Sequence, residues 1–384
     1  MKTRCTHQSV FIHLKKGEHN KMIRILHILK ELDAGGVERM LSNYYAHVNQ
    51  EEYRFDFMVF SDHEGMIEKT IKNSTIHHVT AKEVNAKRHI KETNQVIKEG
   101  HYDIVHTHID KMAIIPLLSA RWHKVPGRFA HSHMAVQKGI QEKLTYPVIK
   151  ALSTDLCACG IDAGTIRFGE KAYRENKITV INNAIEIPKF SFKQSIREKI
   201  RNELKLSEDE TALCCVARFD YQKNHTYLLK VFKEYKELNS RAKLFLMGTG
   251  ELEEEIRSQI DESGIKDVIF MGTRDDVNEI LQGMDIFLLT SHYEGLPVVL
   301  VEAQCTGIMC FVSDKITKEI KKTDGIYYLD IESDPADWAQ SIHEKVGLER
   351  ERAGVYKEIE AGGYSIVKES KKLEALYSKY GRKG

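Results

Sequence analysis

The sequence lacks any long hydrophobic run and lacks an excess of charge of either sign. No stretch of about 20 apolar residues occurs in the 384 residues, so no membrane-spanning helix is expected. Lys and Arg total 57 against 56 Asp and Glu, which gives a net charge of +1. Such a chain has no global attraction for nucleic acid or for an anionic membrane, so nucleic acid is not an expected partner.

Metal-binding patterns are also scarce. The seven cysteines include the close pairs Cys157 with Cys159 and Cys214 with Cys215, but no second pair has the spacing of a zinc site. We interpret them as reduced core residues of a cytoplasmic protein. No Asp-x-Asp sequence occurs, so the usual carboxylate clamp for a nucleotide-bound divalent ion is missing. We therefore expect neither a metal nor a cofactor.

The N-terminal 21 residues differ from the rest. They are polar and basic and contain no apolar core long enough for a secretion signal. We expect them to form a tail, with the fold beginning at Met22. The length of the chain and its 42% hydrophobic content fit two globular domains.

Short β-type runs alternate with helical stretches along the whole chain. In the first half the expected strands are residues 23–29, 55–60, 76–79, 104–107, 128–131, 156–158 and 178–181. A second series follows at residues 211–216, 244–247, 268–271, 286–289 and 309–311. This alternation is typical of parallel sheets with helices on both faces. We predict an α/β protein in which two Rossmann-like domains face each other across a cleft.

The expected domains are an N-terminal one over residues 22–187 and a C-terminal one over residues 188–364. A proline and a charged stretch place the hinge near residues 184–193. Residues 365–384 contain an amphipathic helix, which we expect to pack back toward the N-terminal domain.

The most informative segment is SHYEGLPVVLVEAQ, residues 291–304. Glu294 falls in the loop after an expected strand, and Glu302 lies in the helix that begins near Pro297. The start of this helix directs free amide groups, including those of Val298 and Val299, at the cleft, where they suit a diphosphate. The alternative is an ordinary surface helix with two solvated acids.

A second segment, VARFDYQKNHTYLLKVF at residues 216–232, follows the first strand of the C-terminal domain. Arg218 and Lys223 lie between this strand and a helix start, where two cations suit a phosphate group and a leaving nucleoside diphosphate. Read alone, they are equally compatible with a pair of surface cations. Their coincidence with the two glutamates favours a site.

These segments resemble glycosyltransferase family 4, the retaining GT-B enzymes, and in particular its bacterial exopolysaccharide and capsular polysaccharide members. The resemblance covers residues 22–380. It includes ILHILKELDAGGVERM near the start, DIVHTH at 103–108, RFAHSH at 128–133, VINN at 180–183, LFLMGTGELEEEI at 244–256 and MGTRDDV at 271–277.

The resemblance implies a retaining transfer of a sugar from a nucleotide-sugar, expected to be a UDP-sugar, to a glycan or lipid-linked acceptor in cell-surface polysaccharide biosynthesis. It assigns Glu294 to the donor sugar near the reacting carbon, and Arg218 and Lys223 to the diphosphate. It assigns Glu302 to the ribose hydroxyls, and His133 to the side facing both donor sugar and acceptor. Further donor-binding positions are Gly35, Gly36, Thr273, Arg274, Gly295, Leu296, Pro297 and Val298.

The sequence departs from the family pattern at two places. It has Asn183 and Ala184 where Asn-Gly is usual, which affects the expected hinge geometry. It has Met247, Gly248, Thr249 and Gly250 where Gly-Asp-Gly is common, which affects the expected donor contact of that loop.

Four other interpretations remain open from the sequence. His106, His108, His131 and His133 allow a metal site. Gly35 and Gly36 allow a nicotinamide-dependent dehydrogenase, although the full G-x-G-x-x-G pattern is missing. The chain also fits a catalytically silent protein that binds a nucleotide-sugar or polysaccharide. Finally, residues 123–128 and 137–150 mix basic and apolar side chains, which allows peripheral contact with the inner face of the cell membrane.

Overall fold

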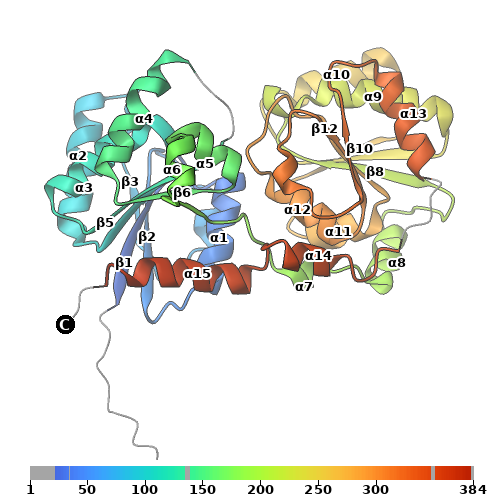
Figure 1. Ribbon diagram of the computed structural model, residues 1–384. Helices are drawn as coiled ribbons and strands as arrows, with labels where there is room; N and C mark the ends of the chain where they lie inside the picture. The colour runs from blue at the N-terminus through green and yellow to red at the C-terminus, as the bar shows by residue number, and fades with distance from the viewer. Residues whose placement is uncertain (1–21, 34, 135–138, 347–350, 382–384) are drawn as a thin grey trace, which may run out of the picture.

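The computed structural model describes residues 22–33, 35–134, 139–346 and 351–381, excluding the side chains of residues 140–143. Two sheets, each covered by helices, lie side by side (Figure 1). The expected tail at residues 1–21 lies outside the described residues. The predicted fold class, two parallel α/β domains, is confirmed.

The N-terminal sheet has the order β3-β2-β1-β4-β5-β6-β7, with every neighbouring pair parallel. Its strands are β1 (Ile23–Ile28), β2 (Tyr53–Val59), β3 (Ile76–His78), β4 (Ile104–Thr107), β5 (Gly127–Ser132), β6 (Asp155–Ala158) and β7 (Ile178–Val180). The sequence order reverses between β1 and β4, and ligands of open α/β sheets bind beyond the strand ends at such a point.

Helices cover both faces of this sheet, which explains why its central strands are buried almost throughout. The helices that follow in this half are α1 (Gly36–His47), α2 (Ala86–Gly100), α3 (Ile114–Trp122), α4 (Ile140–Leu152), α5 (Ile161–Phe168) and α6 (Glu170–Arg174), with short 3-10 turns η1 (Ile67–Thr70) and η2 (Asp110–Ala113). Phe55 and Phe129 pack toward α1, whereas Val105 and Ala130 pack on the opposite face with α3.

The C-terminal sheet has the order β10-β9-β8-β11-β12-β13, again all parallel. Its strands are β8 (Thr211–Val216), β9 (Ala242–Met247), β10 (Val268–Gly272), β11 (Ile286–Leu289), β12 (Met309–Ser313) and β13 (Ile326–Leu329). The strand β13 was not predicted: it is a four-residue edge strand with three half-buried residues, so it has no clear hydrophobic pattern. The order reverses between β8 and β11.

The remaining elements complete the second half of the chain. They are α7 (Ile187–Phe190), α8 (Gln194–Glu203), η3 (Tyr221–Lys223), α9 (His225–Leu238), α10 (Glu253–Ser263), α11 (Val277–Gly283), α12 (Val298–Cys305), η4 (Lys318–Ile320), α13 (Pro335–Val346), α14 (Tyr356–Ala361) and α15 (Ile366–Ser378). In the described part of the chain, no helix is long and apolar enough to cross a membrane. The six described cysteines are buried and form no disulfide.

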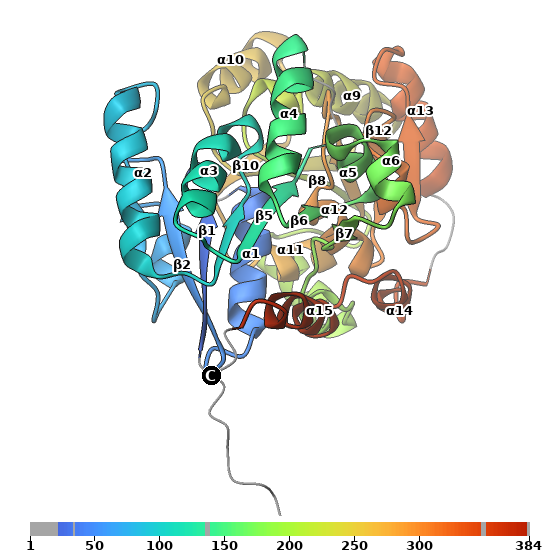
Figure 2. The ribbon, with the colours of Figure 1, turned by 60° about the vertical axis from the view of Figure 1, so that its left-hand side comes forward.

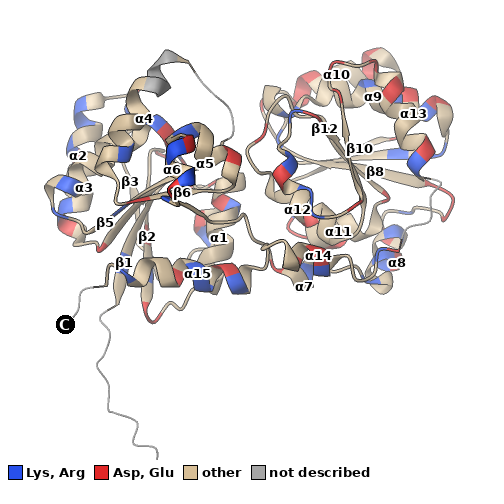
Figure 3. Ribbon diagram, viewed as in Figure 1, with Lys and Arg blue, Asp and Glu red and all other residues tan. Residues whose placement is uncertain are grey.

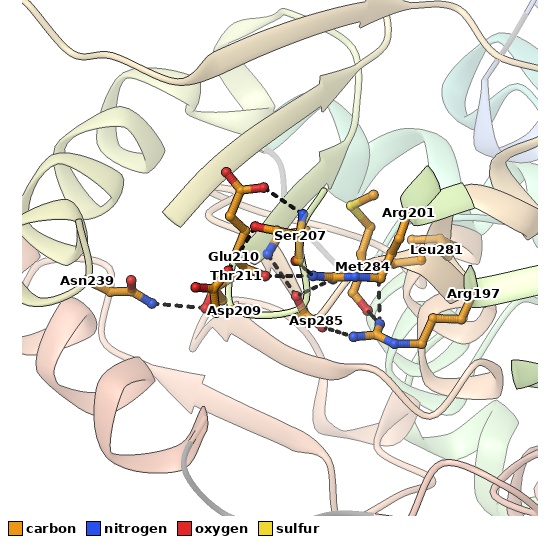
Figure 4. Close-up of polar contacts among 12 residues, drawn as sticks. Arg197, Arg201, Ser207, Asp209, Glu210, Thr211, Asn239, Leu281, Met284 and Asp285 are labelled. Atoms are coloured by element: carbon orange, nitrogen blue, oxygen red, sulfur yellow. Dashed lines mark hydrogen bonds and ion pairs between the residues drawn. The ribbon is translucent and has the colours of Figure 1, made fainter. Parts of the chain in front are cut away.

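A buried ionic network attaches α8 to the C-terminal sheet (Figure 4). Asp285, just before β11, accepts hydrogen bonds from Arg197 Nη2 at 2.6 Å and Arg201 Nη1 at 3.1 Å. Arg201 also donates to the carbonyl oxygens of Ser207 and Glu210 at 2.6 and 2.8 Å. Because one carboxylate and several carbonyls satisfy both guanidinium groups, the connection after the linker is firmly bound to the C-terminal domain.

The C-terminal helix α15 returns to the N-terminal domain and runs along its lower side (Figures 1 and 2). Tyr53 Oη donates to the carbonyl oxygen of Glu374 at 3.1 Å, and Tyr377 is fully buried against Phe55 and Phe129. The chain therefore connects the two domains twice, once before α7 and once before α15.

Candidate active site

The first wall of the site is the turn between β8 and α9. Asp220 Oδ1 accepts a hydrogen bond from the backbone amide of Lys223 at 3.1 Å, which closes η3. Asn224 has a left-handed backbone with φ of 52° and caps α9 through the amide of Tyr227. These two caps hold the Lys223 side chain at the strand end beside β11.

Lys223 forms an ion pair with Glu294, which lies in the loop after β11. Lys223 Nζ is 2.5 Å from Glu294 Oε1, and both side chains are largely buried. Ser291 Oγ donates to the same oxygen at 2.8 Å, and Gln222 Nε2 donates to Oε2 at 3.1 Å. Three donors therefore fix the orientation of one buried carboxylate.

The structure places the two predicted cations differently. Lys223 contacts Glu294, whereas the Arg218 side chain is 56% exposed and has Asp220 as its ionic neighbour at 3.5 Å. Arg218 is thus available to a ligand with little desolvation. The sequence predicted that both cations hold a diphosphate, and the structure adds that Lys223 must share its charge with Glu294.

Glu302 occupies the inner side of α12, with the residue only 3% exposed. Burial raises the pKa of its carboxyl group, and Arg39 on α1 of the opposite domain is the charge that lowers it. The helix begins at Val298 after Pro297, as the sequence suggested. A buried carboxylate at this place is prepared to accept hydrogen bonds from hydroxyl groups, because each bond offsets part of the desolvation cost.

The two domains meet at Gly295. A Cβ atom built on Gly295 would lie 2.0 Å from the carbonyl oxygen of His133, so only glycine permits this approach. Asn183 Nδ2 donates to the carbonyl oxygen of Leu296 at 2.6 Å, which ties the linker to the same loop. The loop carrying Glu294 therefore lies directly against the end of β5, where His133 is located.

His133 lies immediately after β5 and is partly exposed. Its Nε2 atom is 2.9 Å from Nδ1 of His108, and its ring stacks on that of His131 with 4.0 Å between centroids. Burial lowers its pKa to about 3, so the ring is neutral at pH 7. A neutral imidazole offers one donor and one acceptor.

Gly35 and Gly36 form the start of α1, as expected, with Gly35 as the N-cap residue. The Glu38 carboxylate folds back over Gly35, where an added Cβ would lie 2.1 Å from Oε2. Burial raises the pKa of Glu38 to about 7, and Arg218 is among the charges that lower it. Gly36 has no neighbour within 4 Å of an added Cβ, so its surroundings are open.

Thr273 and Arg274 lie after β10, on the edge strand of the C-terminal sheet. Arg274 forms a bidentate pair with Asp276 at 2.8 and 2.6 Å, which raises its pKa. Because its guanidinium group is already paired, we expect this loop to contact a donor through its backbone groups. These two residues do not contact the Glu294 cluster.

Several residues around the site were not singled out from the sequence. Gln222 and Ser291 hold the Glu294 loop and stand within quoted motifs, but a polar residue in a loop does not reveal which group it contacts. Asn183 was noted only as part of the hinge motif, where the sequence departs from the family pattern, and its contact with this loop was not predicted. Glu319 accepts hydrogen bonds from the amides of Ile161, at 2.6 Å, and Asp162 across the domain boundary. No sequence pattern links residues so far apart in the chain.

The described residues contain three groups of side chains close enough to share a metal ion: His27 with His106 and His108, His108 with His131 and His133, and Glu31 with Asp33 and His63. In the last group, Glu31 and Asp33 are half-buried and His63 is exposed. Of the predicted ligand set, His106, His108, His131 and His133, all four are brought together, but their nitrogens already contact one another.

Comparison with known proteins shows which family this chain resembles. Residues 196–344 match the family model of glycosyl transferases group 1. EpsF of Bacillus subtilis, whose name assigns it only provisionally to the glycosyltransferases, is 32% identical over 87% of this chain and 91% of its own length. The UDP-Gal:α-D-GlcNAc-diphosphoundecaprenol α-1,3-galactosyltransferase of Escherichia coli is 31% identical over 57% of this chain and 60% of that protein.

Solved structures show the same architecture. HepE of Anabaena in complex with UDP-glucose superposes with a TM-score of 0.76 at 16% identity, covering 93% of this chain and all of that one. WaaG, a glycosyltransferase of lipopolysaccharide biosynthesis, gives 0.71 at 14% identity over 92% and 99%. The dehydrogenase alternative is therefore wrong, and the chain belongs to the group 1 glycosyltransferases and has the GT-B fold.

Proposed function

We propose that this protein is a retaining glycosyltransferase that moves a sugar from a UDP-sugar to a lipid-linked glycan acceptor in cell-surface polysaccharide biosynthesis. The name of the Escherichia coli relative, which specifies a UDP-sugar and a diphosphoundecaprenol acceptor, supports both substrate classes. The observation that carries the proposal is the buried Lys223–Glu294 pair, held by Ser291 and Gln222 and facing the His133 loop.

The donor site has a distinct role for each group. Arg218 and the amides at the start of α12 would hold the diphosphate, because a cation and a helix N-terminus both attract anions. Glu302 would accept hydrogen bonds from the ribose hydroxyls, and the backbone at Gly35, Gly36, Thr273 and Arg274 would border the donor. In this proposal Arg218 and the amides of α12 neutralise the diphosphate in place of a divalent ion, so transfer should persist in the presence of EDTA.

In the transfer step, the bond between the anomeric carbon and the diphosphate oxygen breaks, and the acceptor hydroxyl oxygen bonds to the same face of that carbon. The hydroxyl proton passes to the departing diphosphate. Positive charge develops on the sugar and negative charge on the leaving group. Glu294 stabilises the former, while Lys223 and Arg218 stabilise the latter; Glu294 and Lys223 are already held in place by their mutual contact before the reaction begins.

Substitution of Glu294 tests this assignment. Glu294→Gln keeps the shape and the contact with Ser291 but removes the charge, so transfer and hydrolysis of UDP-hexoses should fall by about 100-fold or more while UDP affinity stays measurable. Glu262→Gln, an exposed change on α10, is the matched control. Normal turnover in Glu294→Gln would contradict the role, and a wild-type protein that binds donor without any turnover would favour the silent binding protein.

The surface of α3 and α4 suits a lipid-linked acceptor. Trp122 is 80% exposed and Leu144 is 71% exposed, and Leu118 and Val148 are exposed beside them. Figure 3 shows basic segments in blue on α3 and α4. The cations Arg121 and Lys150 stand on this pair of helices, which touch where Arg121 Nη1 donates to the carbonyl oxygen of Ala151. Apolar side chains bordered by cations are typical of a surface that binds anionic membranes. Residues 137–138 of the predicted membrane segment lie outside the described residues.

Flotation with vesicles that contain anionic lipid tests this surface. The double substitution Trp122→Ser and Leu144→Ser should abolish flotation at low salt, because it removes the two most exposed apolar anchors of α3 and α4. Leu238→Ser, on a partly exposed position of α9, should float like the wild type. Equal flotation of all three proteins, or none by the wild type, would remove the membrane assignment.

A further inference from the structure

Five histidines gather at the point where the strand order of the N-terminal sheet reverses. His27 lies in β1, His106 in β4 and His131 in β5, while His108 and His133 directly follow β4 and β5. His27 and His106 are direct partners in the parallel register. The rings stack at centroid distances of 4.0 Å for His131 with His133 and 4.4 Å for His106 with His108.

Hydrogen bonds connect three of these rings in series, leading from the core to the cleft. His27 Nδ1 is 3.1 Å from His108 Nε2, and His108 Nδ1 is 2.9 Å from His133 Nε2. His133 thus uses Nε2 inside the protein, and among the described residues its Nδ1 forms no hydrogen bond and is the nitrogen that a ligand could use. A separate branch runs from Tyr377 Oη to His106 Nδ1 at 2.6 Å and from His106 Nε2 to His131 Nδ1 at 3.2 Å.

All three rings of the series are neutral near pH 7. Burial lowers the pKa of His27 and His133 to about 3 and the pKa of His108 well below its usual value. A neutral imidazole carries one proton, so each ring donates at one nitrogen and accepts at the other. The direction of a single hydrogen bond in the series therefore sets the tautomer of every ring.

Two directions are possible, and the buried end of the series separates them. His27 Nε2 is buried without a hydrogen-bond partner. If His133 donated inward, His27 would leave a buried N–H group without an acceptor there. If His27 donates outward, only a lone pair is left unpaired, and unpaired buried N–H groups are the rarer case in proteins.

We propose that His108 and His27 are positioning residues that hold His133 in the tautomer with its proton on Nδ1, so that His133 donates a hydrogen bond to a sugar hydroxyl in the cleft. This inference rests on the proposed glycosyl transfer. The loop of Glu294 lies against the carbonyl oxygen of His133 at Gly295, so Glu294 and His133 stand on two loops that are in contact. The resemblance assigned His133 to the donor sugar and acceptor, His108 was considered only as a candidate metal ligand, and His27 was given no function.

This arrangement and a metal site place different demands on the same rings. His108, His131 and His133 lie close enough to share a metal ion, and each would bind it through the lone pair of one ring nitrogen. In the series, His108 Nδ1 and His133 Nε2 are 2.9 Å apart and share one proton, so at most one of these two nitrogens has a lone pair free for a metal. Elemental analysis of the purified protein therefore distinguishes them, and a stoichiometric transition metal would overturn the proposal.

The tautomer is directly measurable. In the wild-type protein labelled with ¹⁵N-histidine, with His133 assigned through His133→Asn, we expect His133 to show a protonated Nδ1 and an unprotonated Nε2 at pH 7.5. A protonated Nε2 on His133 would overturn the proposal. This measurement needs no turnover, so it stands even if no UDP-sugar serves as a donor, whereas absence of turnover would contradict the proposed function alone.

Variants of His108 supply the kinetic test. In His108→Asn the side-chain amide replaces the Nδ1–H donor, so kcat should stay within about threefold of wild type. His108→Leu removes the donor, and kcat should fall about tenfold with the Kd for UDP unchanged. His343→Leu, at an exposed site on α13, is the control for histidine loss. Equal kcat for His108→Leu and wild type, or equal losses in the Asn and Leu variants with unchanged thermal stability, would overturn the assignment.

Discussion

The contact between Gly295 and His133 makes a specific prediction about domain closure. Replacement of Gly295 by alanine puts a methyl group 2.0 Å from the His133 carbonyl oxygen, 3.1 Å from its carbonyl carbon and 3.4 Å from Met134 Cα. Real Cβ atoms essentially never come closer than 3.0 Å to such atoms, so the two loops must separate by at least 1 Å. Both neighbours are main chain, which cannot move aside as a flexible side chain would.

Separating the two loops should lower the rate of transfer, because the loops belong to different domains. The simplest relief is a slight opening of the cleft, which moves Glu294 away from the His133 side. A misplacement of about 1 Å in reacting geometry costs about 100-fold in rate, or about 2.7 kcal/mol. UDP binding should change little, because its expected contacts at Arg218 and α12 lie within the C-terminal domain.

The assay is steady-state transfer with a UDP-sugar, combined with calorimetric titration of UDP and small-angle scattering. We expect Gly295→Ala to lower kcat about 100-fold, to keep the UDP Kd within about threefold and to increase the radius of gyration. Gly264→Asn, at a left-handed position with open space around it, is the matched control because asparagine tolerates that conformation. A normal kcat with unchanged scattering would refute the claim that this contact sets the closed geometry.

Three further predictions concern charge and pH. Burial raises the pKa of Glu302, so the folded state binds more protons than the unfolded state as the pH rises above 4.5, and ionised Glu302 destabilises the fold. Glu302→Gln should therefore raise the melting temperature at pH 8 but not at pH 4, and it should weaken UDP binding. The same change in melting temperature at both pH values would contradict this. Because the folded pKa of His27 is about 3, stability should fall as pH drops from about 6.5 toward 3, and His27→Phe should flatten that slope in urea titrations. Glu319→Ala removes the acceptor for the amides of Ile161 and Asp162 and should open the cleft in scattering, with Glu332→Ala as an exposed control.

The fold was predictable because its signals are local. Alternating strands and helices need only short windows of sequence, and they indicate parallel sheets with helical crossovers, whereas the order of the strands came from the structure. The one strand that escaped prediction, β13, is a short edge strand whose side chains are half-buried, so the hydrophobic pattern on which the prediction relied is weak there.

The candidate site was proposed from residue types, and their pairings were not predicted. Glu294, Arg218 and Lys223 were singled out because they lie in loops between a strand and a helix start, and Glu302 because it lies in the helix that follows. That Lys223 faces Glu294 could not be derived, since the ion pair joins two loops 71 residues apart. Likewise, four of the five clustered histidines stood in quoted strand-end motifs, yet only their stacking shows which ring contacts which.

The sequence by itself determined the architecture and pointed to a set of candidate residues near strand ends, because these depend on periodicity and on short motifs. Only the tertiary structure decided the contacts between the domains, Gly295 against His133 and Asn183 with Leu296, and the series inside the N-terminal sheet from His27 through His108 to His133. Such contacts depend on how two domains and three strands are placed in space, and no spacing along the chain encodes a distance between them.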